Sequence, residues 1–277
     1  MRIALLQLNS SDDPVANLVV TERMFRQAVA GGAEWVLTPE VTNIVSASRT
    51  RQNEVLRQED DDATLARLSA LAGELGVWLS IGSLALLSGD ADGRFVNRQF
   101  LIGPDGAVQN RYDKIHMFDV ELGGEESYRE SAGYRPGETA VVAETPWGRT
   151  GLTTCYDMRF PALYGSLAQA GASVVTAPSA FTVPTGRAHW HVLLRARAIE
   201  TGCYVLAAAQ TGRHAAVRGR VRHTYGHSLV VDPWGEVVAD GGEGTGVISA
   251  ELDLTLVAKA RSRVPSLSNA RTFAAPS

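Results

Sequence analysis

One cysteine of this sequence stands where a nucleophile could act. Cys155 lies in Leu152-Thr-Thr-Cys-Tyr-Asp-Met-Arg-Phe-Pro161, between the end of an expected strand and the start of an expected helix. A thiolate, the nucleophilic form of cysteine, is favoured near a helix N-terminus or beside a cation. Free cysteine is also among the most buried residue types, so a small apolar core residue is the alternative interpretation.

Two charged residues follow other expected strands. Glu40 comes after the strand Glu34–Thr38, and the ends of strands in α/β sheets are where ligands and catalytic groups usually lie. Lys114 follows the second strand of an expected hairpin. Taken one at a time, each of these two residues could equally be a solvated surface charge.

The histidines offer a different chemistry. His189 and His191 are two positions apart on an expected helix, so their rings point to different sides, whereas a metal-binding pair prefers a spacing of four. No cysteine or carboxylate cluster in the sequence completes a metal site, and no GxGxxG or Walker A motif supports a nucleotide. We therefore expect no metal and no cofactor. A Cys–His hydrolase would take its base from His116, His189, His191, His214, His223 or His227.

A stretch rich in arginine, Gly212–His227, could contact anions, although a solvated loop or a subunit interface is the interpretation we favour. Its arginines are Arg213, Arg218, Arg220 and Arg222.

Strands and helices must alternate to position these residues. The N-terminal third predicts a β-α-β-α-β order, typical of layered α/β folds. Three later hairpins turn at Gly106, Gly148 and Gly235, where glycine supplies a positive φ. Between the second and third hairpins the pattern predicts helix, strand, helix and strand, so the sequence indicates one α/β domain with mixed sheets. The expected elements are strands 2–8, 34–38, 77–87, 95–102, 107–112, 139–144, 149–154, 173–177, 203–209, 227–231 and 236–239, and helices 14–30, 61–75, 161–170 and 186–201.

The composition excludes several classes of protein. The 277 residues are 45% hydrophobic, with 26 Lys plus Arg against 30 Asp plus Glu, a formal net charge of −4. This balance argues against nucleic-acid binding, which needs a basic footprint, and against disorder. No apolar stretch is long enough to span a membrane, and the N-terminus lacks the pattern of a signal peptide. With only two cysteines, Cys155 and Cys203, we expect a reducing, cytoplasmic setting.

Taken together, Glu40, Lys114 and Cys155 resemble the Glu–Lys–Cys triad of the nitrilase superfamily of carbon–nitrogen hydrolases, in the same chain order. The resemblance runs from the first strand to about Pro265 and includes Tyr112-Asp-Lys-Ile-His-Met-Phe-Asp119. Further segments are similar to the branch that contains the deaminated glutathione amidases: Pro178-Ser-Ala-Phe-Thr-Val-Pro-Thr-Gly186, Leu193-Leu-Arg-Ala-Arg-Ala-Ile-Glu200 and Ala207-Ala-Ala-Gln-Thr-Gly212. One segment, residues 121–130, is more acidic than is usual in that branch.

This resemblance implies a fold and an assembly. The fold is a four-layer α-β-β-α sandwich in which two mixed sheets face each other and helices lie outside. Residues 1–265 form the hydrolase domain, and residues 266–277 form a C-terminal surface arm. Members of the superfamily associate through helices, so a homodimer or larger homo-oligomer is expected.

The resemblance also implies the chemistry. Cys155 attacks an amide carbonyl, an amine leaves, and water hydrolyses the resulting thioester. Glu40 is the general base, and Lys114 stabilises the oxyanion together with the backbone N–H of Tyr156. A cation beside Cys155 also favours the thiolate. Glu130 matches the second carboxylate of the superfamily and positions Lys114 or water.

For the substrate, the resemblance favours a small anionic amide, deaminated glutathione, which yields 2-oxoglutarate and cysteinylglycine. Arg159 is the candidate partner of a substrate carboxylate, although an ion pair with Asp157 explains it as well. Phe181 and Thr182 are expected in the pocket wall. The alternatives are an ω-amidase acting on 2-oxoglutaramate-type amides, an N-carbamoyl hydrolase, a nitrilase and, least favoured, a non-catalytic scaffold.

Overall fold

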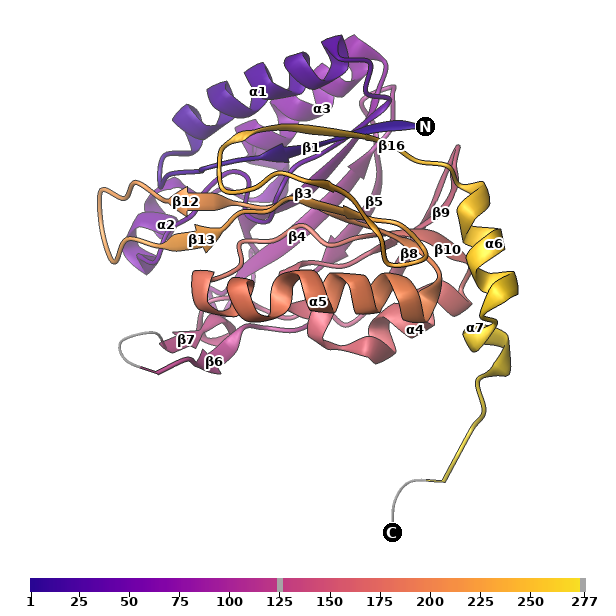
Figure 1. Cartoon of the computed structure of the whole chain (residues 1–277). Helices are drawn as coiled ribbons and strands as arrows, with labels where there is room; N and C mark the ends of the chain where they lie inside the picture. Colours follow the sequence, from indigo (N-terminus) through magenta and orange to yellow (C-terminus); the bar gives the residue numbers. More distant parts are fainter. Residues whose placement is uncertain (124–126, 275–277) are drawn as a thin grey trace.

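Two six-stranded sheets form the centre of the molecule in the computed structural model, which describes residues 1–123 and 127–274 (Figure 1). The first sheet has the order β16 (Gly246–Glu251), β1 (Arg2–Gln7), β2 (Trp35–Leu37), β3 (Trp78–Leu87), β4 (Phe95–Ile102) and β5 (Val108–Asp113). The second has the order β15 (Val237–Asp240), β14 (Leu229–Val231), β11 (Tyr204–Ala207), β10 (Ala172–Thr176), β9 (Gly148–Leu152) and β8 (Val141–Thr145).

Helices cover the outer face of each sheet, and Figure 1 shows α1 and α3 on one side and α4 and α5 on the other. The bounds are α1 (Pro14–Ala30), α2 (Arg49–Val55), α3 (Ala63–Leu75), α4 (Pro161–Gln169), α5 (Val183–Thr201), α6 (Thr255–Arg263) and α7 (Ser266–Asn269). Short 3-10 helices are η1 (Glu59–Asp61), η2 (Glu130–Ala132) and η3 (Cys155–Arg159), and two ribbons pair β6 (Asp119–Glu121) with β7 (Ser127–Arg129) and β12 (Thr211–Arg213) with β13 (His223–Tyr225).

Alternation along the strands separates the layers. In β1, Ile3 and Leu5 belong to the apolar cluster shared with the second sheet, whereas Ala4 and Leu6 belong to the cluster under α1 and α3. Side chains two residues apart lie on one face of a strand, so a fully apolar strand fills both layers at once. A third cluster joins the second sheet to α4 and α5. The predicted four-layer α-β-β-α sandwich is confirmed.

The two sheets share one strand plan. Each has three parallel central strands, β1-β2-β3 and β9-β10-β11, followed by an antiparallel pair, β4-β5 and β14-β15. Each also has one antiparallel strand beside the first parallel strand, β16 and β8. This repetition lies in the strand topology.

Gly82 in β3 marks a close approach of the two sheets. A Cβ atom at this position would lie 1.9 Å from the Thr38 carbonyl oxygen and 2.4 Å from Cβ of Pro178. No side chain fits between these groups, so only glycine allows the segments after β2 and β10 to come this close.

Most predicted elements are present with ends shifted by a few residues; α5, for instance, begins at Val183 rather than at Gly186. Five features were not predicted from the sequence, because short amphipathic segments carry little hydrophobic periodicity: α2, the β6–β7 and β12–β13 ribbons, β16 and α6. Part of the acidic segment 121–130, residues 124–126, lies outside the described residues. In the C-terminal arm, α7 contacts α4 and α5, and Leu267 packs against the helix-covered core of the second sheet.

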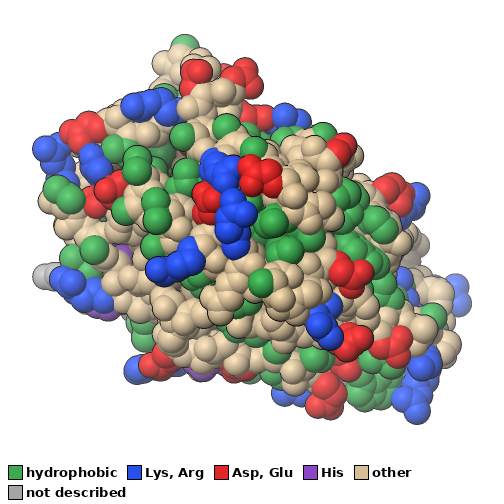
Figure 2. All heavy atoms as spheres, turned by 90° about the horizontal axis from the view of Figure 1, so that it is seen from above, with side chains coloured by type: hydrophobic (Ala, Val, Ile, Leu, Met, Phe, Trp, Pro, Cys, Tyr) green, Lys and Arg blue, Asp and Glu red, His purple; other side chains and the backbone are tan. Residues whose placement is uncertain are grey.

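Charged side chains of both signs lie side by side on the face shown in Figure 2. Between α1 and α3, for example, Arg67 bridges Glu22 and Glu74 at 2.6 Å and 2.7 Å. Among the described residues, no helix is long and apolar enough to cross a membrane.

Candidate active site

Cys155 lies just beyond the carboxyl end of β9 and begins η3. Its φ of +49° is in the left-handed region, which a residue with a side chain adopts only where its surroundings impose it. The backbone N–H of Cys155 donates to the Pro178 carbonyl at 2.9 Å, which ties this turn to the segment after β10. The thiol is buried, with 6% exposure.

A buried carboxylate holds the turn around Cys155. Asp157 is fully buried and accepts hydrogen bonds from the Thr154 N–H (2.9 Å) and the Tyr112 hydroxyl (2.6 Å). It also accepts the backbone N–H of His116 at 3.0 Å, and its oxygen lies 2.7 Å from Nδ1 of that ring. Asp157 therefore connects the nucleophile turn to the segment that carries Lys114.

Lys114 lies between two carboxylates. Its Nζ donates to Glu40 Oε1 at 2.9 Å and to the two oxygens of Glu130 at 3.0 Å and 2.8 Å. Lys114 is 2% exposed and Glu40 5%, so their charges meet in a region from which water is largely excluded. The strand ends of β2 and β5 and the 3-10 turn η2 bring the three residues together.

Neutral donors complete this network. Asn97, in β4, donates from Nδ2 to Glu40 Oε1 at 2.9 Å and to Glu130 Oε1 at 3.4 Å. The Ala180 N–H donates to Glu40 Oε2 at 2.8 Å, and the Phe118 N–H donates to Glu130 Oε2 at 2.6 Å. The two carboxylates are thus held in fixed orientations, which favours preorganised chemistry over a flexible surface ion pair.

The protonation states follow from these contacts. Burial alone would raise the pKa of Glu40, but the Lys114 ammonium, together with hydrogen bonds that include one from the Cys155 thiol, holds that pKa below its ordinary value. Burial would lower the pKa of Lys114, but the charges of Glu130 and Glu40 raise it well above its ordinary value. The resting site therefore holds an ionised Glu40 and a charged Lys114.

The thiol behaves differently from the expectation that a nearby cation favours the thiolate. Burial raises the pKa of Cys155, the charge of Glu40 raises it further, and Lys114 opposes these effects only in part. Cys155 is therefore a neutral thiol hydrogen-bonded to a carboxylate, which is the arrangement of a nucleophile beside its general base.

A cavity of about 640 Å³ opens above these residues. Glu40, Lys114, Glu130, Cys155 and Asn97 form part of its lining. Cationic and aromatic side chains also line the cavity: Arg49, Arg129, Arg220, Arg222, Phe118, Tyr128 and Tyr134. The volume is in the range of cavities that enclose small organic ligands.

The predicted substrate-binding residues divide into two groups. Phe181 and Thr182 line the cavity. Tyr156 and Arg159 are not among its lining residues. The Arg159 guanidinium lies over the rings of Tyr156 (5.8 Å) and Phe181 (5.4 Å), and its Nη2 is 3.2 Å from Nδ1 of His189. Arg159 therefore lies outside the lining of this cavity, and its contact with a substrate carboxylate stays a prediction.

Some cavity residues were not predicted from the sequence. Arg220 and Arg222 lie, as predicted, in a loop, the one that joins β12 to β13; their guanidinium groups lie 5.1 Å and 5.9 Å from the centre of the Tyr128 ring, and both residues line the cavity. The pairing of β12 with β13, which directs this loop, was not predicted. Asn97 lies inside an apolar strand, where a buried amide is itself a sign of a polar partner.

Proteins of known name are similar to this chain in sequence and in fold. Residues 2–262 match the carbon-nitrogen hydrolase family. A deaminated glutathione amidase of Yersinia enterocolitica is 38% identical over 97% of this chain and 92% of its own length, and one of Mus musculus is 41% identical over 95% and 81%. The Caenorhabditis elegans NitFhit protein, which has a crystal structure, is 38% identical in sequence to this chain. The two structures match with a TM-score of 0.90 over 98% of this chain and 65% of that chain.

The sandwich fold with a buried cysteine, carboxylate and lysine at its strand ends defines a hydrolase of the nitrilase superfamily. The chain belongs to the carbon-nitrogen hydrolase family, as its sequence predicted, and it is an enzyme that hydrolyses carbon–nitrogen bonds as an amidase.

Proposed function

We propose that this enzyme hydrolyses its amide through a thioester on Cys155. The observation that carries the proposal is the Glu40 carboxylate, which accepts a hydrogen bond from Lys114 at 2.9 Å and whose charge raises the pKa of the neighbouring Cys155 thiol. One ionised group thus contacts a neutral nucleophile and a cation, and all three line the cavity.

The steps follow from these contacts. Glu40 takes the thiol proton as sulfur attacks the amide carbon, and Lys114 stabilises the negative charge that develops on the carbonyl oxygen. Glu40 then gives the proton to the leaving nitrogen, the C–N bond breaks, and an amine departs. In the second half-reaction, Glu40 removes a proton from water as the water oxygen attacks the thioester carbon. The C–S bond then breaks, the acid is released, and Glu40 returns the proton to sulfur. Glu130 keeps the ammonium of Lys114 in place throughout.

We further propose deaminated glutathione as the substrate, cleaved to 2-oxoglutarate and cysteinylglycine. The names of the relatives support this choice, and so does the cavity, whose volume of about 640 Å³ suits a tripeptide-sized molecule better than a small amide. The substrate carries carboxylates at both ends, and the cavity wall offers arginines to receive them.

Arg222 is the arginine best placed for such a carboxylate. Nη2 of Arg222 donates to the carbonyl of Ala180 at 3.3 Å, and the backbone N–H of Ala180 donates to Glu40. Arg222 therefore lies next to the reacting groups. Its Nε is buried without a hydrogen-bond partner among the described residues. Since an unpaired buried guanidinium N–H is costly, a substrate carboxylate would satisfy it.

A direct comparison of substrates tests the proposal. The purified enzyme is assayed with deaminated glutathione, 2-oxoglutaramate, an N-carbamoyl amino acid and a nitrile, with kcat/KM measured for each. We expect deaminated glutathione to exceed the other three by at least about tenfold, a difference of about 1.4 kcal/mol in transition-state binding. A higher kcat/KM for 2-oxoglutaramate would instead support the ω-amidase alternative.

The thioester has its own test. Rapid mixing with substrate followed by acid quench should trap the acyl group on the peptide that contains Cys155, detected by mass spectrometry. An acyl group on another residue, or none under conditions of burst kinetics, would contradict the covalent route.

We also propose a homodimer or larger homo-oligomer in a reducing compartment such as the cytoplasm. The superfamily resemblance supports the assembly, as do the apolar side chains of Val192 and Ile199, which α5 leaves 67% and 53% exposed. The two free thiols, Cys155 and Cys203, support the compartment. Light scattering on a sizing column measures the assembly directly, and a monomer at micromolar concentration would contradict it.

A further inference from the structure

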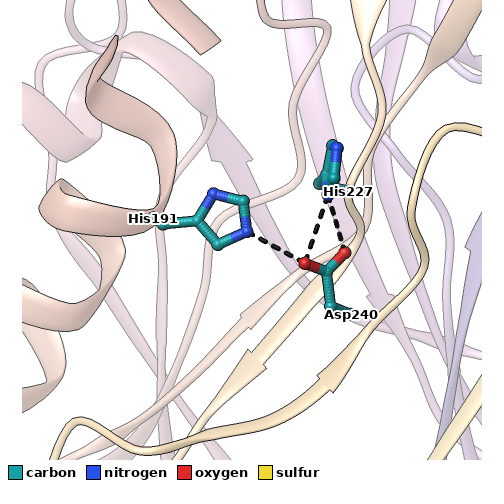
Figure 3. A group of neighbouring side chains, drawn as sticks. All are labelled: His191, His227 and Asp240. Carbon is teal, nitrogen blue, oxygen red and sulfur yellow. Dashed lines mark hydrogen bonds and ion pairs between the residues drawn. The ribbon is translucent and has the colours of Figure 1, made fainter. Parts of the chain in front are cut away.

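Three side chains outside the cavity form a compact group that the amidase chemistry does not use. His191 lies on α5, His227 precedes β14, and Asp240 ends β15. Figure 3 shows both imidazoles beside the Asp240 carboxylate. From the sequence we expected no cysteine or carboxylate cluster to complete a metal site; the fold brings Asp240 to His191 from 49 positions away in the chain.

The spacing of the donor atoms suits a metal ion. Nε2 of His191 is 2.9 Å from Asp240 Oδ2, and Nδ1 of His227 is 2.8 Å from Asp240 Oδ1. One donor atom from each residue can be chosen so that all lie within 4.8 Å of one another. In a tetrahedral zinc site the donor atoms are about 3.4 Å apart, because each lies about 2.0–2.2 Å from the ion. Small side-chain shifts are therefore enough to admit an ion.

The charges also suit a divalent cation. Within residues 1–123 and 127–274, the ion-pair contacts of Asp240 are with His191 and His227, and no Arg or Lys neutralises it. A carboxylate and two imidazoles are a ligand set typical of zinc and related ions.

Hydrogen bonds and ring stacking hold His227 and Asp240 in place. His227 has a φ of +57°, and its carbonyl accepts a hydrogen bond from Nε1 of Trp190 at 2.8 Å. The Tyr225 ring stacks on the His227 imidazole with 4.5 Å between centroids. The Gly242 N–H donates to Asp240 Oδ1 at 2.8 Å, and the His227 N–H donates to the Gly242 carbonyl at 2.7 Å. His227 and Asp240 are therefore already oriented before an ion binds, because hydrogen-bonded partners of this kind orient metal ligands.

We propose that His191, His227 and Asp240 bind one divalent transition-metal ion of the zinc class, with water in the fourth position. The side chains are 33%, 20% and 32% exposed, so an ion can enter from solvent and keep a water ligand. None of the three lines the catalytic cavity. The ion therefore lies outside the amidase site, where it joins α5 to the β14–β15 hairpin.

Titration of the full-length, chelator-treated protein with Zn²⁺ tests the site, by calorimetry and by competition with a chromophoric indicator. The titration uses the Cys155→Ala background, so that zinc on the catalytic thiol does not contribute. We expect one equivalent per chain and a higher melting temperature with zinc. His191→Ala and Asp240→Asn should each lower the affinity by more than about 100-fold, a larger loss than removal of an outer partner causes.

His189→Ala is the matched control, since it removes a histidine from the same helix but not from the group, and it should bind zinc like the parent. Circular dichroism without zinc shows whether each variant is folded. Absence of saturable binding in the parent, or equal binding by the folded His191→Ala and Asp240→Asn variants, would overturn the proposal. Because no readout depends on turnover, the result is independent of the proposed amidase substrate.

Discussion

The two sheets have equivalent strand ends, but the residues just beyond them differ: one set has a cysteine, a glutamate and a lysine, and the other has two serines and a glycine. In the shared plan, the strands β9, β2 and β5 correspond to β1, β10 and β15, respectively. Cys155 follows β9, Glu40 follows β2 and Lys114 follows β5. At the same distances after β1, β10 and β15 the chain has Ser10, Ser179 and Gly241.

The second set of strand ends is closed by neutral hydrogen bonds. The Ser10 hydroxyl donates to the Thr42 carbonyl at 3.0 Å and accepts from Nε2 of Gln210 at 3.0 Å. Nε2 of Gln7 donates to the carbonyls of Gly242 and Gly244 at 2.8 Å and 2.6 Å. The comparison shows that the scaffold supplies two equivalent places, and that residue type distinguishes the charged set, which lines the cavity, from the set closed by neutral hydrogen bonds.

Removal of the nucleophile should have the largest effect. Cys155→Ala is expected to lower kcat by at least about 10⁴-fold, since loss of a covalent nucleophile leaves only the stabilisation by surrounding groups. The melting temperature should change little, because alanine fills most of the same volume. Turnover near the wild-type rate would show that the charged strand ends are not the reactive set.

Glu40→Gln should come next, with a loss of about 10³-fold in kcat, because the amide keeps the shape but cannot accept the thiol proton. Glu130→Gln is the matched comparison, since it also removes a carboxylate from Lys114 but leaves the base, and we expect a loss of about 10–100-fold. Equal losses in the two variants would mean that both carboxylates act only by holding Lys114.

Arg222→Met tests the cavity wall. We expect KM for a dicarboxylic amide to rise about 10–100-fold, which corresponds to one charge-assisted hydrogen-bonded contact, while a neutral amide is affected far less. Arg218→Met is the control, since Arg218 comes from the same stretch but pairs with Glu54 at the surface. A similar rise in KM for the neutral amide would point to distortion of the ribbon instead.

Ser10→Ala should change stability without changing chemistry. Loss of the two hydrogen bonds at the buried hydroxyl is expected to lower the free energy of unfolding by about 1–3 kcal/mol. Thermal unfolding measures this change, and kcat per folded molecule should stay within about twofold of wild type. A large fall in kcat with unchanged stability would make the second set of strand ends part of the catalytic apparatus.

The pH dependence should be the smallest effect. The proposed general base, Glu40, must be ionised to act, and its pKa lies below its ordinary 4.5, so kcat/KM should fall only when acid protonates it below that pH. The raised pKa of the Cys155 thiol means that no increase should accompany ordinary thiol ionisation near pH 9.0. A profile measured from pH 6 to 9.5 should therefore be flat, and a rise above pH 8 would indicate a preformed thiolate.

The resemblance of three motifs in order to the nitrilase superfamily carried most of what could be predicted, namely the four-layer sandwich and the grouping of Glu40, Lys114 and Cys155. The residues themselves indicated the α/β order and buried strands, the first from the apolar run in Arg2–Leu8. The cavity wall was harder, because Arg220 and Arg222 reach it only through a short ribbon. The group of His191, His227 and Asp240 was hidden for the same reason, since its members meet through tertiary structure and not through spacing.

The hydrogen bond from Ala180 to Glu40 joins residues 140 positions apart in the chain. Contacts of this span form late in folding, because a long loop must close before they are gained. The two sheets can each begin to form from local segments, but neither holds a complete set of reactive groups. During refolding, recovery of turnover should therefore lag behind recovery of helical circular dichroism, so that enzymatic activity reports the final docking of one sheet on the other.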